Sequence, residues 1–229
     1  GFPFDHQQWA PQLSTLAGHA RVIAPDLQGF GKQYTAKRCI TMEDHARDIA
    51  ELLDHLGQER AVVVGLSMGG YIALAFAEAY PQRLAGLALC NTRATADQAE
   101  AQAGRERLAR TVMEQGVGAV VDGLLEKLFH PNTDKSVRGD VRQMMFRQPP
   151  SGVAASARGM AARMDRSPVL ARITAPCAVI TGADDLLIPL AESEHLAAAV
   201  PEARLTVIPQ VGRQTEALVV ERRRVVGQQ

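Results

Sequence analysis

A serine lies at the centre of the sequence Gly65-Leu66-Ser67-Met68-Gly69, between a valine-rich run, Ala61–Val64, and an alanine-rich run, Tyr71–Tyr80. The first run predicts a strand and the second predicts a helix. A tight turn that joins a strand to a helix holds its central residue in a strained backbone conformation, so we expect the Ser67 side chain to be exposed at the end of the sheet. A serine hydroxyl there becomes a nucleophile when a neighbouring base takes its proton.

The glycines on either side of Ser67 have no Cβ, and we expect Gly65 and Gly69 to let the strand and the helix approach closely. The alternative is a glycine-rich turn that carries an ordinary serine. The five-residue pattern alone is a weak signal, but its position between a predicted strand and a predicted helix favours the nucleophile.

A serine nucleophile also needs a carboxylate to orient its base, and N–H donors to hold the negative charge that develops on the substrate oxygen. Asp184 and Asp185 follow the predicted strand Cys177–Gly182 and are the candidate acids, with a solvated turn as the alternative for each. As oxyanion donors we expect the backbone N–H groups of Met68 and Phe2.

The elements that must position these groups alternate along the chain. Periodicity predicts strands at 21–26, 61–64, 84–90, 177–182 and 204–208, and helices at 7–16, 42–56, 71–80 and 190–200. This order predicts an α/β fold with a mostly parallel, doubly wound sheet. Ligands bind at the carboxyl ends of the strands in such sheets. Ser67, Asn91, Asp184 and Asp185 all fall at such ends.

The pattern between Arg93 and Leu170 is different, because it contains helical segments and no convincing strand. We interpret residues 93–170 as a helical cap over the ligand edge of a core that comprises residues 1–92 and 171–229. The cap arginines could bind a substrate carboxylate, but a solvated helix face is the favoured explanation. These arginines are Arg158, Arg163 and Arg166.

Composition and charge restrict the class of protein. The chain has 229 residues, 46% of them hydrophobic and 22% charged, and its formal net charge is zero. These values are ordinary for a globular protein. The zero net charge argues against a nucleic-acid or anionic-membrane partner, because either would need a basic surface. No apolar run approaches the ~18 residues that span a membrane.

The cysteines Cys39, Cys90 and Cys177 are scattered and odd in number, which predicts reduced thiols and a cytoplasmic location. The sequence contains no metal-ligand cluster, phosphate loop or dinucleotide fingerprint, so we expect no metal and no cofactor. Self-association into a homo-oligomer is left open.

The chain resembles the α/β-hydrolase family, in particular its small serine esterases, perhydrolases and enol-lactone hydrolases. The resemblance implies hydrolysis of small carboxylic esters or lactones through an acyl-enzyme, with Asp185 as the acid because it lies three residues after a glycine. It disfavours a haloalkane dehalogenase, which has an aspartate at the position of Ser67. The segments that carry it are Gly1–Trp9, Ala24–Gly31, Gly65–Gly70, Gly182–Asp185 with Pro189, and Val207–Pro209.

Two departures from the family pattern affect the expected activity. The family has a hydrophobic strand that ends in His-Gly before the Phe-Pro loop, and since this chain begins at that glycine, we expect amino-terminal strands to be missing. The family also ends its last strand with Ile-Pro-x-x-Gly-His, where the histidine is the base. Here Arg213 follows Gly212. An arginine stays protonated, so Arg213 cannot accept the Ser67 proton.

Two hypotheses account for Arg213. In the first, the reading frame departs from the family near Gly212, and the intact protein would supply a histidine there. In the second, the chain is a divergent, catalytically inactive homologue that binds a small ligand. Among the other histidines, His6 could line the pocket and His130 could overhang the site, but a structural or solvated role is favoured for both.

Overall fold

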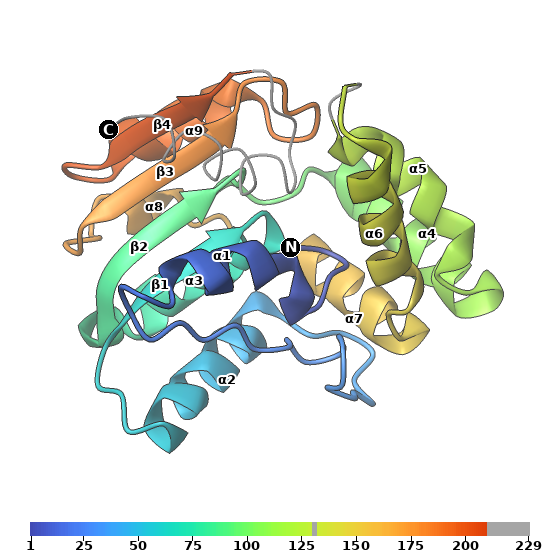
Figure 1. Ribbon diagram of the computed structural model, residues 1–229, viewed down its shortest axis with the longest axis horizontal. Coiled ribbons are helices and arrows are strands. Elements are labelled where there is room, and N and C mark those ends of the chain that lie inside the picture. The colour runs from blue at the N-terminus through green and yellow to red at the C-terminus, as the bar shows by residue number, and fades with distance from the viewer. Residues whose placement is uncertain (130–131, 210–229) are drawn as a thin grey trace.

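Four parallel strands form the central sheet of the protein. The structure is a computed structural model that describes residues 1–129 and 132–209. The strands are β1 (Ala61–Leu66), β2 (Leu84–Cys90), β3 (Cys177–Gly182) and β4 (Arg204–Ile208), in the spatial order β1-β2-β3-β4 (Figure 1). Every neighbouring pair is parallel, which confirms the predicted sheet. The carboxyl ends of all four strands therefore lie at one edge.

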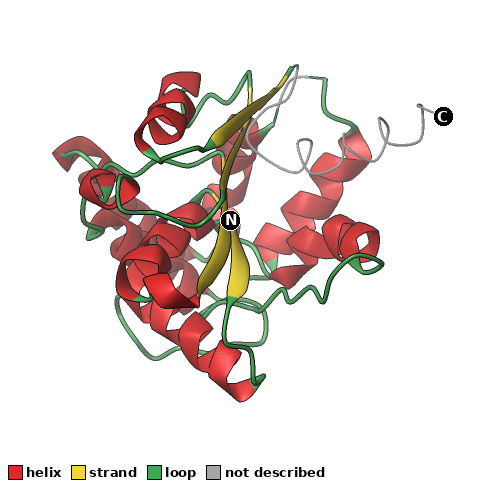
Figure 2. Cartoon of the chain, turned by 90° about the vertical axis from the view of Figure 1, so that its left-hand side faces the viewer, coloured by secondary structure: helices red, strands yellow, loops and turns green. Residues whose placement is uncertain are grey.

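Helices cover both faces of this sheet (Figure 2). The helices between β2 and β3 include α4 (Ala99–Gln115), α5 (Gly118–Leu128) and α6 (Lys135–Phe146). These three lie together beyond the carboxyl ends of the strands, which Figure 1 draws as arrowheads. The helices are η1 (His6–Trp9), α1 (Ala10–Leu16), α2 (Met42–His55), α3 (Met68–Ala79), η2 (Pro81–Arg83), α4 (Ala99–Gln115), α5 (Gly118–Leu128), α6 (Lys135–Phe146), α7 (Pro150–Ala161), α8 (Ser167–Leu170) and α9 (Leu190–Ala199).

Helix α2 begins and ends where its sequence predicts. Thr41 is the N-cap, and its hydroxyl oxygen accepts a hydrogen bond from the Asp44 N–H at 3.1 Å. The Asp44 carboxylate in turn accepts from the Thr41 N–H at 3.0 Å, which completes a capping box. Gly57 has a φ of 64° just after the helix, a conformation that favours glycine. The apolar side of α2 packs against α3.

Close backbone contacts hold the turn between β1 and α3. Ser67 has φ 56° and ψ −112°, the strained conformation expected at this turn. A Cβ on Gly65 would overlap the backbone carbonyl of Gly69, and a Cβ on Gly70 would overlap the Thr92 side chain. A Cβ on Gly69 would meet nothing within 4 Å, so the expected role of Gly69 is wrong. The close approach requires glycine at 65 and 70 instead.

The predicted strand at residues 21–26 is also wrong, since this segment has no regular secondary structure. Within the described residues no strand lies beside it, and a strand needs a neighbour for its backbone N–H and C=O groups. The segment is held by a side chain instead. The Asp26 carboxylate accepts hydrogen bonds from the backbone N–H groups of His6 at 2.9 Å and Lys32 at 3.2 Å.

Helix α7 packs directly against the loop that precedes α2. The Ile40 N–H donates to the Ala155 carbonyl at 3.1 Å. A Cβ on Gly152 would overlap the backbone of Gly29, so the two segments are in backbone contact there. Pro150 occupies the first turn of α7, where a missing N–H costs no helical hydrogen bond. Helix α7 therefore anchors the helical segment between β2 and β3 to the loops that contain Gly29 and Ile40.

Two of the cap arginines are buried, so the expectation of a solvated helix face is wrong for them. The Arg163 guanidinium pairs with Asp97 at 2.8 Å and lies 4.1 Å from the centre of the Tyr71 ring. Arg166 pairs with Glu78 at 3.2 Å. Burial alone would raise the pKa of Asp97, but hydrogen bonds and charge from its arginine neighbours lower it. These pairs join the helical segment to α3 and to the loop after β2.

No described helix is both long and apolar enough to cross a lipid bilayer. Within the described residues, Cys39, Cys90 and Cys177 form no disulfide. Burial raises the pKa of the Cys177 thiol to about 11, so this side chain stays protonated at neutral pH.

Replacing Gly65 with alanine should destabilise the protein, because the new methyl group would overlap backbone atoms that cannot move without displacing α3. We expect the free energy of unfolding to fall by roughly 2–3 kcal/mol, as for other overpacked sites. Gly69→Ala is the matched control, since it enters open space and removes a glycine from a helix, which should be neutral or stabilising by up to about 1 kcal/mol. Urea unfolding measures both changes, and equal losses in the two variants would contradict the close-approach explanation.

His45 is a titratable side chain buried in α2. It is 0% exposed, and neither ring nitrogen has a hydrogen-bond partner within the described residues. Burial lowers its pKa from 6.5 to about 4, because the charged imidazolium would lose its hydration. Between these values the unfolded chain takes up a proton at His45 that the folded chain does not. The resulting stability is fully present above pH 6.5 and is lost as the pH falls towards 4.

We therefore expect His45 to remove about 3 kcal/mol from the free energy of unfolding between pH 6.5 and pH 4. His45→Leu should abolish that part of the decline, because leucine does not titrate. His55→Leu is the control on the same helix, since His55 is exposed, and it should leave the decline in place. Chemical unfolding at a series of pH values tests this expectation, and an undiminished decline in His45→Leu would refute it.

Candidate active site

Ser67 lies at the carboxyl end of β1 and directly before α3, as the sequence predicts. Its strained backbone turn matches the geometry expected for a nucleophile. The expected exposure is wrong, however, because Ser67 is only 3% exposed.

The segment Cys90–Thr92 at the end of β2 connects Ser67 to the candidate acid. The Ser67 N–H donates to the Cys90 carbonyl at 2.9 Å, and the Thr92 hydroxyl donates to the Ser67 carbonyl at 2.8 Å. Between these two contacts, Asn91 has a φ of 43° and is buried. Its side-chain amide donates to the Asp185 carboxylate at 2.8 Å. Three consecutive residues thus bind both groups, because Cys90 and Thr92 bind the Ser67 backbone and Asn91 binds the Asp185 carboxylate.

The environments of the two candidate acids differ sharply. Asp185 is 8% exposed, and its Oδ1 accepts hydrogen bonds from the backbone N–H groups of Leu187 at 2.8 Å and Ile188 at 3.0 Å. Asp184 is exposed. A carboxylate with donors on both oxygens is fixed in orientation, and Oδ2 keeps a lone pair for one further N–H. This geometry favours Asp185 over Asp184 as the acid.

The candidate oxyanion donors lie in two separate segments. Met68 is the first residue of α3, and the first N–H groups of a helix have no partner within it. Phe2 precedes η1, and its ring meets the Phe30 ring edge to face at 6.1 Å. Within residues 1–129 and 132–209, neither the Phe2 N–H nor the Met68 N–H donates a hydrogen bond. Both groups are therefore available to an anion.

The described histidines do not supply an obvious base. The His6 Nδ1 is 2.7 Å from the Asp26 carboxylate, and His45 is buried in α2. His19, His55 and His195 are exposed. His130 lies outside the described residues, as does Arg213, which occupies the position where the family has its histidine.

Two features of the site region were not anticipated from the sequence. Asn91 was recognised only as a polar residue after a strand, which is a signal for the ligand edge but not for contact with Asp185. Asp5, His6 and Asp26 bring ligand-type atoms within 4.8 Å of one another. Their donors and acceptors are already engaged, because Asp5 binds Arg147 and His6 binds Asp26.

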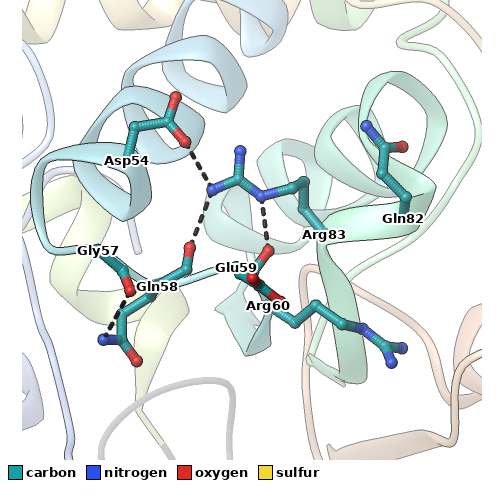
Figure 3. Close-up of a pocket in the computed structure, with 7 residues that line it drawn as sticks. All are labelled: Asp54, Gly57, Gln58, Glu59, Arg60, Gln82 and Arg83. Carbon is teal, nitrogen blue, oxygen red and sulfur yellow. Dashed lines mark hydrogen bonds and ion pairs between the residues drawn. The ribbon is translucent and has the colours of Figure 1, made fainter.

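A surface hollow lies at the amino ends of β1 and β2, away from Ser67 (Figure 3). The Arg83 guanidinium within it donates to the backbone carbonyls of Glu59 at 2.6 Å and Gln58 at 2.9 Å, and pairs with Asp54 at 2.8 Å. These bonds tie the end of α2 to the turn before β2. We assign the hollow a structural role. Its lining residues are Asp54, Gly57, Gln58, Glu59, Arg60, Gln82 and Arg83.

Comparison with known proteins supports the fold described above. Residues 1–214 match the family model described as alpha/beta hydrolase fold. A thermophilic esterase from Thermogutta terrifontis is 40% identical, with a TM-score of 0.93 over 97% of this chain and 83% of the esterase. An enol-lactonase from Burkholderia xenovorans is 28% identical, with a TM-score of 0.86 over 99% of this chain and 85% of that protein.

Sequence comparison gives a similar result. The 3-oxoadipate enol-lactonase 2 of Acinetobacter baylyi is 27% identical over 203 residues, which are 87% of this chain and 74% of the relative. The family match covers well over half of the chain and includes the Ser67 turn, the Asn91 segment and Asp185. The chain is therefore a hydrolase-like enzyme that belongs to the α/β-hydrolase fold family.

Proposed function

We propose that the protein hydrolyses small carboxylic esters or lactones through an acyl-enzyme intermediate on Ser67. The observation that carries the proposal is the contact that the segment Cys90–Thr92 makes with both groups. Cys90 and Thr92 bind the backbone at the strained Ser67 turn, and Asn91 between them binds a buried carboxylate, Asp185, which backbone N–H groups also orient. A turn without chemical function would not need a buried, hydrogen-bonded acid held by the segment that also binds the turn.

The reaction follows from the roles of these groups. The Ser67 oxygen attacks the substrate carbonyl carbon while a base removes its proton, and the carbonyl oxygen becomes an oxyanion between the N–H groups of Met68 and Phe2. The alcohol leaves with the proton that the base returns. Water then attacks the acyl group in the same way and releases the carboxylic acid. Asp185 orients the base and stabilises its protonated form.

We also propose that residues 93–170 form the cap that selects the acyl group. The helical segment contributes large buried apolar side chains, which belong to the same hydrophobic cluster as Phe4 and Met68. An apolar wall of this kind favours small, uncharged acyl groups, because a charged group would lose its hydration there. The side chains that support this proposal are Val121, Leu128, Phe129, Val141 and Met145.

A second candidate function is the binding of a small ligand without turnover. Arg213 favours it, since the family has its catalytic histidine at that position and an arginine cannot act as a base. Loss of one triad member commonly lowers the rate by several orders of magnitude, even where the pocket is intact.

Turnover of a short-chain nitrophenyl ester separates the two candidates. We expect Ser67→Ala to lower kcat/KM by at least ~100-fold if Ser67 is the nucleophile. The Ser156→Ala variant is a matched control, because Ser156 is buried in α7 and is outside the proposed machinery. Equal rates for the protein and Ser67→Ala would refute the hydrolase proposal for this chain and leave the ligand-binding candidate.

Restoring the base tests the role of residue 213. We expect Arg213→His to raise kcat at least ~100-fold at pH 8, the contribution typical of a positioned general base. The increase should fade as the pH falls below the imidazole pKa, because a protonated histidine cannot accept the Ser67 proton. Arg213→Gln is the control for loss of the positive charge. An identical gain with glutamine would show that charge, not proton transfer, limits the rate.

A further inference from the structure

The segment that carries Phe2 is held in place by a buried carboxylate. We call Gly1–Asp5 the oxyanion loop, which the Phe4 N–H closes by donating to the Gly1 carbonyl at 3.1 Å. Asp5 ends the loop as the N-cap of η1, and its Oδ1 accepts a hydrogen bond from the Gln7 N–H at 3.0 Å. Since the Asp5 side chain is only 5% exposed, its remaining lone pairs need donors from the protein.

Those donors come from the end of α6, in the helical segment more than 140 residues away. The Arg147 guanidinium binds both Asp5 oxygens, through Nε to Oδ2 at 3.0 Å and through Nη2 to Oδ2 at 2.8 Å and Oδ1 at 3.1 Å. The same Nη2 also donates to the Gln7 side chain at 2.7 Å. A planar guanidinium with several fixed donors restricts the direction of the carboxylate as well as its distance.

Gln148 adds a second connection between the same parts. Its side-chain N–H donates to Asp5 Oδ2 at 3.0 Å, and its side-chain oxygen accepts from the Gly31 N–H at 2.9 Å. Gln148 is 2% exposed, so these two bonds, and a third from its side-chain N–H to the Met144 carbonyl at 2.8 Å, are sheltered from water. The oxyanion loop, the loop at Gly31 and the end of α6 are therefore joined at one buried point.

We propose that Arg147 and Gln148 are positioning residues that fix the oxyanion loop, and with it the Phe2 N–H, from the cap. The inference rests on the proposed function, because it assigns a catalytic purpose to the position of Phe2. Asp5 directly follows the closed turn that contains Phe2, so the bonds to its carboxylate fix the end of that turn. Oxyanion donors stabilise the transition state only at the correct distance, and a misplacement of about 1 Å can cost roughly 100-fold in rate.

The test compares two arginines of the same segment. Arg147→Gln removes the two-pronged bond to Asp5, whereas Arg142→Gln removes an exposed pair between α6 and Asp122 of α5 that does not touch the loop. With a short-chain nitrophenyl ester, we expect Arg147→Gln to lower kcat ~10-fold or more with little change in KM, since only transition-state binding is affected. Arg142→Gln should stay within about twofold of the parent protein, as for most exposed ion pairs.

Two further variants separate positioning from a loss of folding. Asp5→Asn keeps an N-cap for η1 but loses the charged pair, and should lower kcat like Arg147→Gln. Combining the two changes should cost little more than either alone, because both break one interaction. Arg147→Lys keeps the charge and should restore part of kcat. A lower melting temperature with an unchanged kcat of the folded protein would overturn the proposal.

Amide hydrogen exchange of residues 1–5 provides a readout that does not require turnover. It should be faster in Arg147→Gln than in Arg142→Gln by ~10-fold or more, as local opening becomes easier. If turnover does not depend on Ser67, the hydrolase proposal fails, and exchange alone then decides whether Arg147 positions the loop. Equal exchange in the two variants overturns the inference whatever the activity.

Discussion

The structure depends on the contact between the Ser67 turn and the end of β2. The turn is strained, and strain of this kind persists only where surrounding contacts determine the backbone completely. Here the Ser67 N–H donates to the Cys90 carbonyl, and the Ser67 carbonyl accepts from the Thr92 hydroxyl. Gly65 has no side chain, so β1 can lie against the start of α3, and Gly70 has none, so α3 can lie against Thr92. The contacts that place Ser67, the proposed nucleophile, are therefore backbone contacts and the Thr92 hydroxyl, none of which involves a catalytic partner.

Buried carboxylates make the other long-range connections. Asp185 is held beside Asn91, Asp5 beside Arg147 and Asp97 beside Arg163, and in each pair the partners are far apart in sequence. A buried carboxylate without donors would be costly, so each site favours the one arrangement of segments that satisfies it. One of the three pairs, Asp5 with Arg147, joins the helical segment at 93–170 to the rest of the chain. The position of that segment is thus specified by charge as well as by apolar packing.

Local sequence signals predicted those parts of the fold that local interactions decide. The strands 84–90, 177–182 and 204–208 have the predicted bounds, because periodicity and turn residues agree there. The strand at 21–26 failed because a strand also needs a neighbour. The burial of Arg163 and the contact between Asn91 and Asp185 could not be predicted either. Both depend on residues brought close only by the folded chain, and a single sequence carries no spacing signal for such pairs.

The proposed acid and oxyanion donors are held in place independently of the proposed base. Asp185 is oriented by Asn91 and by backbone N–H groups, and Met68 by the start of α3, so none of these groups needs a histidine to hold its position. Changing the residue at 213 can therefore remove proton transfer while the rest of the site stays assembled. In that case a hydrolase and a protein that binds the ligand without turnover would differ only in the side chain at one position. The same independence explains how a chain could keep every other element of this site with an arginine at the position of the base.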